Sequence, residues 1–168
     1  MNINLRYFGL TFSLIIFLIV NSYPQSINSS IKSLSEKADL IVEGKVIQKK
    51  SSWNKDKTRI YTDVTVQVDD YLKGNKGNNN IVITTMGGEV DGVGELYTHM
   101  PRFNNDENVL VFVKEDKKDK SLKVFNGEEG KVTLYKDKVT GERVTSFNKK
   151  ISTLKKEIKS YVNKKSQQ

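Results

Sequence analysis

Apolar and polar side chains alternate most regularly over residues 60–69, IYTDVTVQVD. One side of this stretch carries Ile60, Thr62, Val64, Val66 and Val68, and the other side carries mainly polar residues. A period of two over this length indicates a β-strand with one buried and one exposed face.

Shorter patterns predict further strands, over residues 40–48, 81–86, 108–113, 122–125 and 131–135. Gly44 interrupts the first of these, and a glycine inside a strand marks a bend, a bulge or a closely crossing backbone. The stretch 108–113, NVLVFV, is apolar on both sides, which indicates a central strand covered on both faces. Polar segments rich in turn-forming residues separate the strands, at residues 51–58, 74–80, 115–121, 126–130 and 136–142.

A short helix is expected at about residues 30–37, with Ser29 or Ser30 as its cap. A C-terminal helix is expected over residues 148–163, because apolar residues recur there at spacings of three and four. We expect that helix to point its lysines at water. Residues 164–168 are expected to form a flexible tail.

These elements predict a mainly β fold in a single domain. Residues 23–147 are expected to form a small OB-like barrel of five to seven strands, with the short helix before it and the amphipathic helix after it.

The N-terminus resembles an export signal. Arg6 precedes an apolar run, Phe8–Val20, that is short for a membrane span. We therefore expect residues 1–22 to be a signal peptide that is cleaved after Ser22, and the protein to be secreted or periplasmic. A retained anchor and a buried helix are the alternatives for this segment.

The net charge of +8 is concentrated at the C-terminus. Residues 149–165 carry seven lysines against Glu157 alone, so that residues 23–147 are nearly neutral. A near-neutral, exported barrel argues against nucleic-acid binding, which needs a basic groove. The C-terminal lysines predict at most a weak contact with an anionic surface. The chain has no cysteine, which excludes disulfides and thiol chemistry.

Four segments together resemble a poorly characterised family of secreted bacterial proteins and, more distantly, netrin-like and metalloproteinase-inhibitor OB modules. They are ADLIVEGKV (38–46), YTDVTVQVDDYLKG (61–74), GGEVDG (87–92) and PRFNNDENVLVFV (101–113). The resemblance implies an OB-like barrel and export, and it implies no activity. The inhibitors of that fold depend on cysteines, so their mechanism does not transfer to this chain. A Gly-Glu pair that is usual in the family is here Asp106-Glu107.

No catalytic constellation is visible, and we expect neither enzymatic activity nor a cofactor. The single histidine, His99, has no serine in a nucleophile motif to activate. The acidic residues of the glycine-rich segment are weak calcium candidates: Glu89, Asp91 and Glu95. The chain lacks the EF-hand pattern, and we expect no metal site there.

Several residue types common at interface centres lie in the connecting segments, and we expect these segments to contact a partner. They are Trp53, Tyr97, His99, Met100 and Arg102. Phe103 is expected to cap the end of the barrel. Glycines expected to serve the backbone are Gly44, Gly74, Gly87, Gly88 and Gly92, and Gly94 is also expected to be free to take positive φ.

The sequence thus predicts an exported, non-enzymatic binding module, of inhibitor-like type or otherwise, whose partner is a protein or an envelope component. The alternative is an envelope-associated structural protein that is held by the basic C-terminal segment or by an uncleaved signal anchor. The oligomeric state stays open.

Overall fold

The computed structural model describes residues 25–74 and 77–165. The described residues from Lys32 onward belong to one compact unit. The predicted signal peptide, with its cleavage point after Ser22, lies outside the described residues. Within the part that is described, every helix is too short or too polar to span a membrane.

The helices and strands follow one another along the chain in this order: α2 (Gln25–Lys37), β1 (Leu40–Trp53), β2 (Ile60–Lys73), β3 (Asn80–Met86), β4 (Gly88–Val90), β5 (Val93–Glu95), β6 (Asn108–Glu115), β7 (Leu122–Val124), the 3-10 helix η1 (Gly127–Gly130), β8 (Lys131–Lys136), β9 (Arg143–Thr145) and α3 (Ile151–Lys165).

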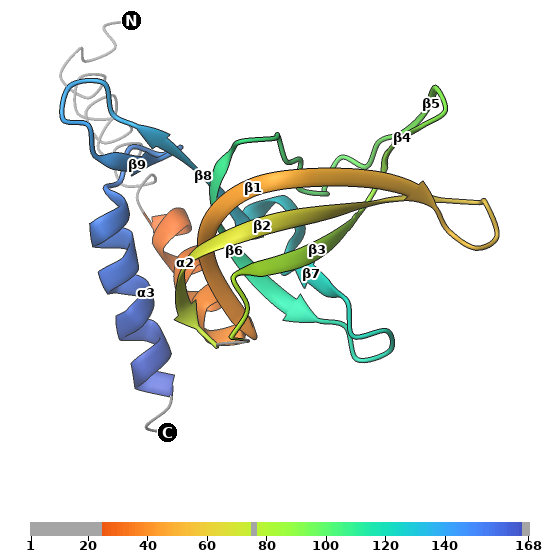
Figure 1. Cartoon of the computed structure of the whole chain (residues 1–168). Coiled ribbons are helices and arrows are strands. Elements are labelled where there is room, and N and C mark those ends of the chain that lie inside the picture. The colour runs from red at the N-terminus through yellow and green to blue at the C-terminus, as the bar shows by residue number, and fades with distance from the viewer. Residues whose placement is uncertain (1–24, 75–76, 166–168) are drawn as a thin grey trace, which may run out of the picture. The chain divides into compact units, whose positions relative to one another are not determined.

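Five strands close into a barrel in the order β1-β2-β3-β7-β6, with β6 returning to pair with β1 (Figure 1). Neighbouring strands are antiparallel except β3 and β7, which run parallel at Ile83 and Leu122. The predicted mainly β fold is confirmed: an OB-like barrel with a short helix before it and a C-terminal helix after it in the chain. Strands β8 and β9 extend the sheet beyond β6, and β4 and β5 form a separate two-stranded sheet.

The barrel interior is filled by aliphatic side chains from every strand of the barrel, with one phenylalanine added from a loop. This residue, Phe103, is 4% exposed and belongs to the core cluster. Residues 109–113 of β6 are all buried, as the apolar pattern on both faces predicted.

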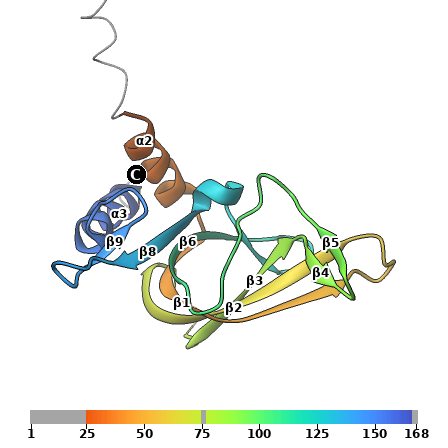
Figure 2. The same ribbon diagram turned by 90° about the horizontal axis from the view of Figure 1, so that it is seen from above.

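Strands β1 and β2 form a long, curved ribbon that extends beyond the barrel on the side away from α3 (Figures 1 and 2). The pairing register shifts at three points, one of them at Gly44. A Cβ atom there would lie 2.2 Å from the Gln67 carbonyl oxygen, so the expected close backbone approach is present.

The predicted connector at 51–58 begins too early. Strand β1 continues to Trp53, because Ser51 and Trp53 still pair with Thr62 and Ile60 of β2. The turn itself is short and is closed by the Asn54 side chain, which accepts the Thr58 N–H at 2.8 Å.

Two pairings in the C-terminal half were not predicted from the sequence. The short strands β7 and β8 do not pair with one another, because each pairs with β6 instead. The residues just before the last helix form an additional strand, β9, along β8.

The last helix is anchored by ion pairs as well as by its apolar face. Leu154 and Ile158 of α3 are fully buried. Glu43 of β1, only 5% exposed, accepts hydrogen bonds from Lys155 of α3 at 2.7 Å and from Arg143 of β9 at 2.8 Å. The expectation that the helix simply points its lysines at water is therefore wrong for Lys155, since a buried carboxylate requires a cationic partner.

Candidate functional site

The glycine-rich segment around residues 88–95 is a β-hairpin. Strands β4 and β5 pair from Gly88–Glu95 to Val90–Val93, around a two-residue turn. The turn residues Asp91 and Gly92 have φ values of 52° and 78°. Positive φ at both positions is the geometry that favours Asp-Gly in tight hairpins. Gly94 is not among the residues with positive φ, so it does not use the conformational freedom expected of it.

Three hydroxyl residues lie in one row across the β1–β2–β3 sheet. Ser51 pairs with Thr62, and Thr62 pairs in turn with Thr85. The Ser51 and Thr62 hydroxyls are 2.9 Å apart, and Thr62 donates its hydrogen to the Gly87 carbonyl at 2.6 Å. Because Thr62 has one hydrogen and has given it to Gly87, Ser51 must donate to Thr62, which leaves the Ser51 oxygen as an acceptor.

Thr85 completes the row but differs from its neighbours. Its Oγ1 atom is buried and has no hydrogen-bond partner among the described residues. The residue as a whole is partly exposed, so its exposed surface belongs to its other atoms. An unpaired buried hydroxyl is unusual, because such a group loses its hydrogen bonds to water on folding.

The hairpin sits directly on this row. A Cβ atom at Gly88 would lie 2.4 Å from Thr62 Oγ1 and 2.5 Å from Ser51 Oγ, and the φ of Gly88 is +135°. No other residue type fits this position without displacing the hydroxyl pair.

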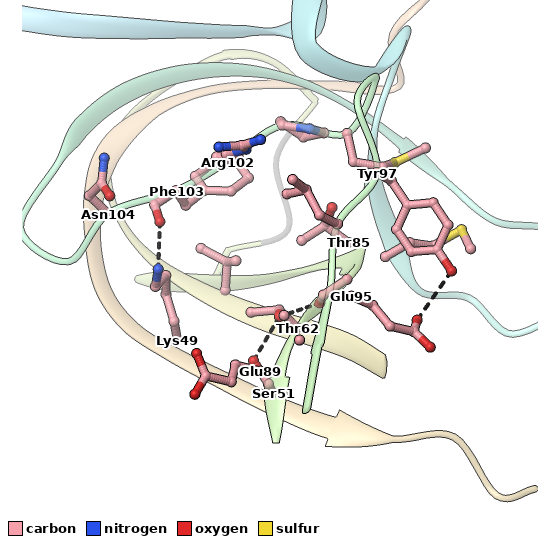
Figure 3. Close-up of a pocket in the computed structure, with 18 residues that line it drawn as sticks. Lys49, Ser51, Thr62, Thr85, Glu89, Glu95, Tyr97, Arg102, Phe103 and Asn104 are labelled. Atoms are coloured by element: carbon pink, nitrogen blue, oxygen red, sulfur yellow. Dashed lines mark hydrogen bonds between the residues drawn. The ribbon is translucent and has the colours of Figure 1, made fainter. Parts of the chain in front are cut away.

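A cavity of about 580 Å³ opens between the hydroxyl row, the hairpin and the segment 96–104 (Figure 3). Its strand wall consists of Lys49, Ser51, Thr62, Val64, Thr85 and Met86. The opposite wall belongs to the hairpin, to Leu96 and Tyr97, and to residues 100–104. The volume lies within the range of small-ligand sites in proteins.

Hydrogen bonds hold both walls in place. Lys49 of β1 donates from Nζ to the Phe103 carbonyl at 2.6 Å across one side of the cavity. On the other side, the Glu95 carboxylate accepts the Ile60 N–H at 3.0 Å and the Tyr97 hydroxyl at 3.1 Å. Desolvation of the Tyr97 phenol and its hydrogen bond to Glu95 raise the pKa of Tyr97.

A nearly buried ion pair between Lys131 and Glu107 holds the segment 102–107 in place. Glu107 accepts hydrogen bonds from Lys131 and Thr133, each at 2.6 Å, and from the Asn104 N–H at 2.9 Å. Burial alone raises the pKa of Glu107, but these hydrogen bonds outweigh burial and hold the pKa below its ordinary value. The Lys131 ammonium also lies 5.0 Å from the centre of the Phe103 ring.

The structure brings together three of the five predicted contact residues. Tyr97, Met100 and Arg102 line the cavity, whereas Trp53 and His99 are outside its lining. His99 serves the fold through its carbonyl, which accepts the Glu128 N–H at 3.0 Å.

The calcium candidates do not converge. Glu89 is exposed, Asp91 occupies the hairpin turn and Glu95 is already bonded to Ile60 and Tyr97. Among the residues described, no group of three acidic, histidine or cysteine side chains could hold a metal ion.

Of the predicted backbone glycines, Gly74, Gly87, Gly88 and Gly92 have positive φ. Gly44 instead allows the close backbone approach described above.

The polar residues of the strand wall were not among the predicted site residues: Lys49, Ser51, Thr62 and Thr85. A signal existed for the two threonines, because each continues the apolar side of its strand. No such signal exists for Lys49 and Ser51, because a register shift between Val46 and Gln48 changes which residues of β1 face inward.

No protein-family model matches this chain, and no relative was found among curated proteins. The resemblance to secreted OB-like proteins therefore stays a prediction.

Proposed function

We propose that this protein is an exported, non-enzymatic binding module, and that the cavity beneath the β4–β5 hairpin is its binding site. The observation that carries the proposal is the convergence of Tyr97, Met100 and Arg102 with the polar strand wall around one cavity. Tyrosine and arginine contribute most often to binding energy, and methionine adapts to varied apolar partners. Loops on a rigid barrel are a common place for such sites.

The C-terminal lysines give less support to the alternative, an envelope-associated structural protein. Three of these lysines are paired with acids of this chain: Lys149 with Glu157, Lys150 with Glu142, and Lys155 with Glu43 and Asp70. Charges engaged within the fold contribute little to attraction by a distant anionic surface.

Retention of a partner from the native culture fluid tests the proposal. The immobilised protein is compared with a Met100→Ala/Arg102→Ala variant and with Val139→Ser, a control at a turn residue that is 93% exposed. We expect one set of proteins to be retained by the wild type and the control and lost from the double variant. Equal retention by all three proteins would exclude the cavity as the binding site.

A further inference from the structure

We propose that the cavity binds an uncharged peptide segment of a protein partner. An apolar side chain of that segment packs against Met86, Leu96 and Met100, and its main-chain amide hydrogen-bonds to the strand wall. This inference rests on the proposed function and specifies the chemistry of the occupant.

The strand wall offers both hydrogen-bond donors and hydrogen-bond acceptors. Ser51 keeps an acceptor oxygen after donating to Thr62. Lys49 gives one of its N–H groups to Phe103, and the other two have no partner among the described residues. A peptide amide carries an N–H donor next to a carbonyl acceptor, and it therefore complements these two residues.

Thr85 adds a third group once its side chain turns. Thr85 lines the cavity, and a rotation about χ1 from one staggered position to another redirects its hydroxyl, which is buried without a partner among the described residues. In the proposed complex this hydroxyl donates a hydrogen bond to an acceptor of the ligand. A ligand with an acceptor at this place is therefore favoured.

The remaining lining is apolar and flexible. Leu96 is 69% exposed at the cavity rim, and Met86 and Met100 are partly exposed. Aliphatic and thioether side chains pack well against irregular apolar groups such as amino-acid side chains. A sugar ring favours an open aromatic face, whereas of the two aromatic residues in this lining Phe103 is 4% exposed and Tyr97 is only partly exposed.

The charges of the lining favour an uncharged occupant. Lys49 and Arg102 are balanced by Glu89 and Glu95, so the lining has no net charge. A polyanion such as a nucleic acid needs an excess of cations along its path.

The direct test is an NMR titration of the whole ¹⁵N-labelled protein with three probes. They are N-acetyl-leucine methylamide, the corresponding capped glutamate, and N-acetylglucosamine. We expect the capped leucine to shift the amide resonances of Lys49, Ser51, Thr85 and Leu96, and to bind about tenfold more tightly than the other two probes.

Two valine variants on one strand test the amide contact. Thr85→Val should weaken binding of the capped leucine about tenfold, as expected for one lost hydrogen bond to a buried group. Thr84→Val is the matched control, because Thr84 bonds to Asp63 at 2.7 Å, is not part of the cavity lining, and should leave the affinity unchanged.

Failure of this inference is distinguishable from failure of the proposed function. Cavity shifts with the sugar and none with the capped leucine would overturn the peptide assignment while leaving the cavity as a binding site. Absence of cavity shifts with all probes, or an unchanged affinity in Thr85→Val, would also overturn the inference. The retention experiment with Met100→Ala/Arg102→Ala judges the proposed function independently.

Discussion

Replacing Thr85 with valine should stabilise the free protein. Among the residues that the structure describes, the Thr85 hydroxyl is buried without a hydrogen-bond partner, and an unsatisfied group of this kind costs about 1–3 kcal/mol. Valine keeps the branched shape and suits a β-strand. Since Thr85 is partly exposed as a residue, we take the lower end, about 1 kcal/mol, which corresponds to a rise of about 3 °C in Tm for a chain of this length.

Urea denaturation of three valine variants measures this effect. Thr62 belongs to the same hydroxyl row, and Thr62→Val should lower the free energy of unfolding by about 2 kcal/mol. The substitution leaves the Gly87 carbonyl and the Ser51 hydroxyl without their partner. Thr84→Val changes an exposed residue pair and should stay within about 0.5 kcal/mol. If Thr85→Val destabilises the protein as much as Thr62→Val does, the hydroxyl is satisfied and the reasoning about the row is refuted.

Three further predictions concern the hairpin, the buried ion pair and calcium. Gly88→Ala should destabilise the fold by about 2 kcal/mol in thermal unfolding, because the new Cβ atom would meet two hydroxyls at a residue with positive φ. The control Gly94→Ala, whose nearest contact would be at 4.0 Å, should change the stability little. Equal losses of stability in the two variants would contradict the hairpin geometry. The pKa of Glu107 is lowered in the folded state. The contribution of Glu107 to stability is therefore fully present above its pKa in the unfolded state, and it is lost as the pH falls through its pKa in the folded state. Glu107→Gln should therefore lower the free energy of unfolding by about 3 kcal/mol at neutral pH, and it should flatten the acid limb of the curve of stability against pH. An unchanged acid limb would disprove the contribution of Glu107 to this pH dependence. Calcium should leave Tm unchanged in the wild type and in Asp91→Ala, and a rise that Asp91→Ala abolishes would restore the calcium hypothesis.

Side-chain periodicity was sufficient for the barrel. The alternation in β2 and the continuous apolar run of β6 are local patterns, and each reports directly on which faces are buried. The β4–β5 hairpin could also have been predicted, because Asp91-Gly92 between Val90 and Val93 is a strong turn signal. The glycines of this segment were predicted to serve the backbone, but the Asp-Gly turn was not predicted.

The candidate site was only partly predictable, for a physical reason. A bulge moves Lys49 and Ser51 to the inner face of β1, and no local pattern marks that shift. Similarly, the partners of Glu43 come from β9 and α3, more than ninety residues away along the chain. Contacts of this kind depend on the closed barrel and not on neighbouring residues.

Photo-crosslinking from position 100 tests the central claim most directly. A photoreactive amino acid replaces Met100 at the cavity, and in a control it replaces the exposed Val139. After irradiation in the native culture fluid, we predict a discrete protein adduct from position 100 and none from position 139. Identical adducts from both positions, or none from position 100, would contradict the assignment of the cavity as the binding site.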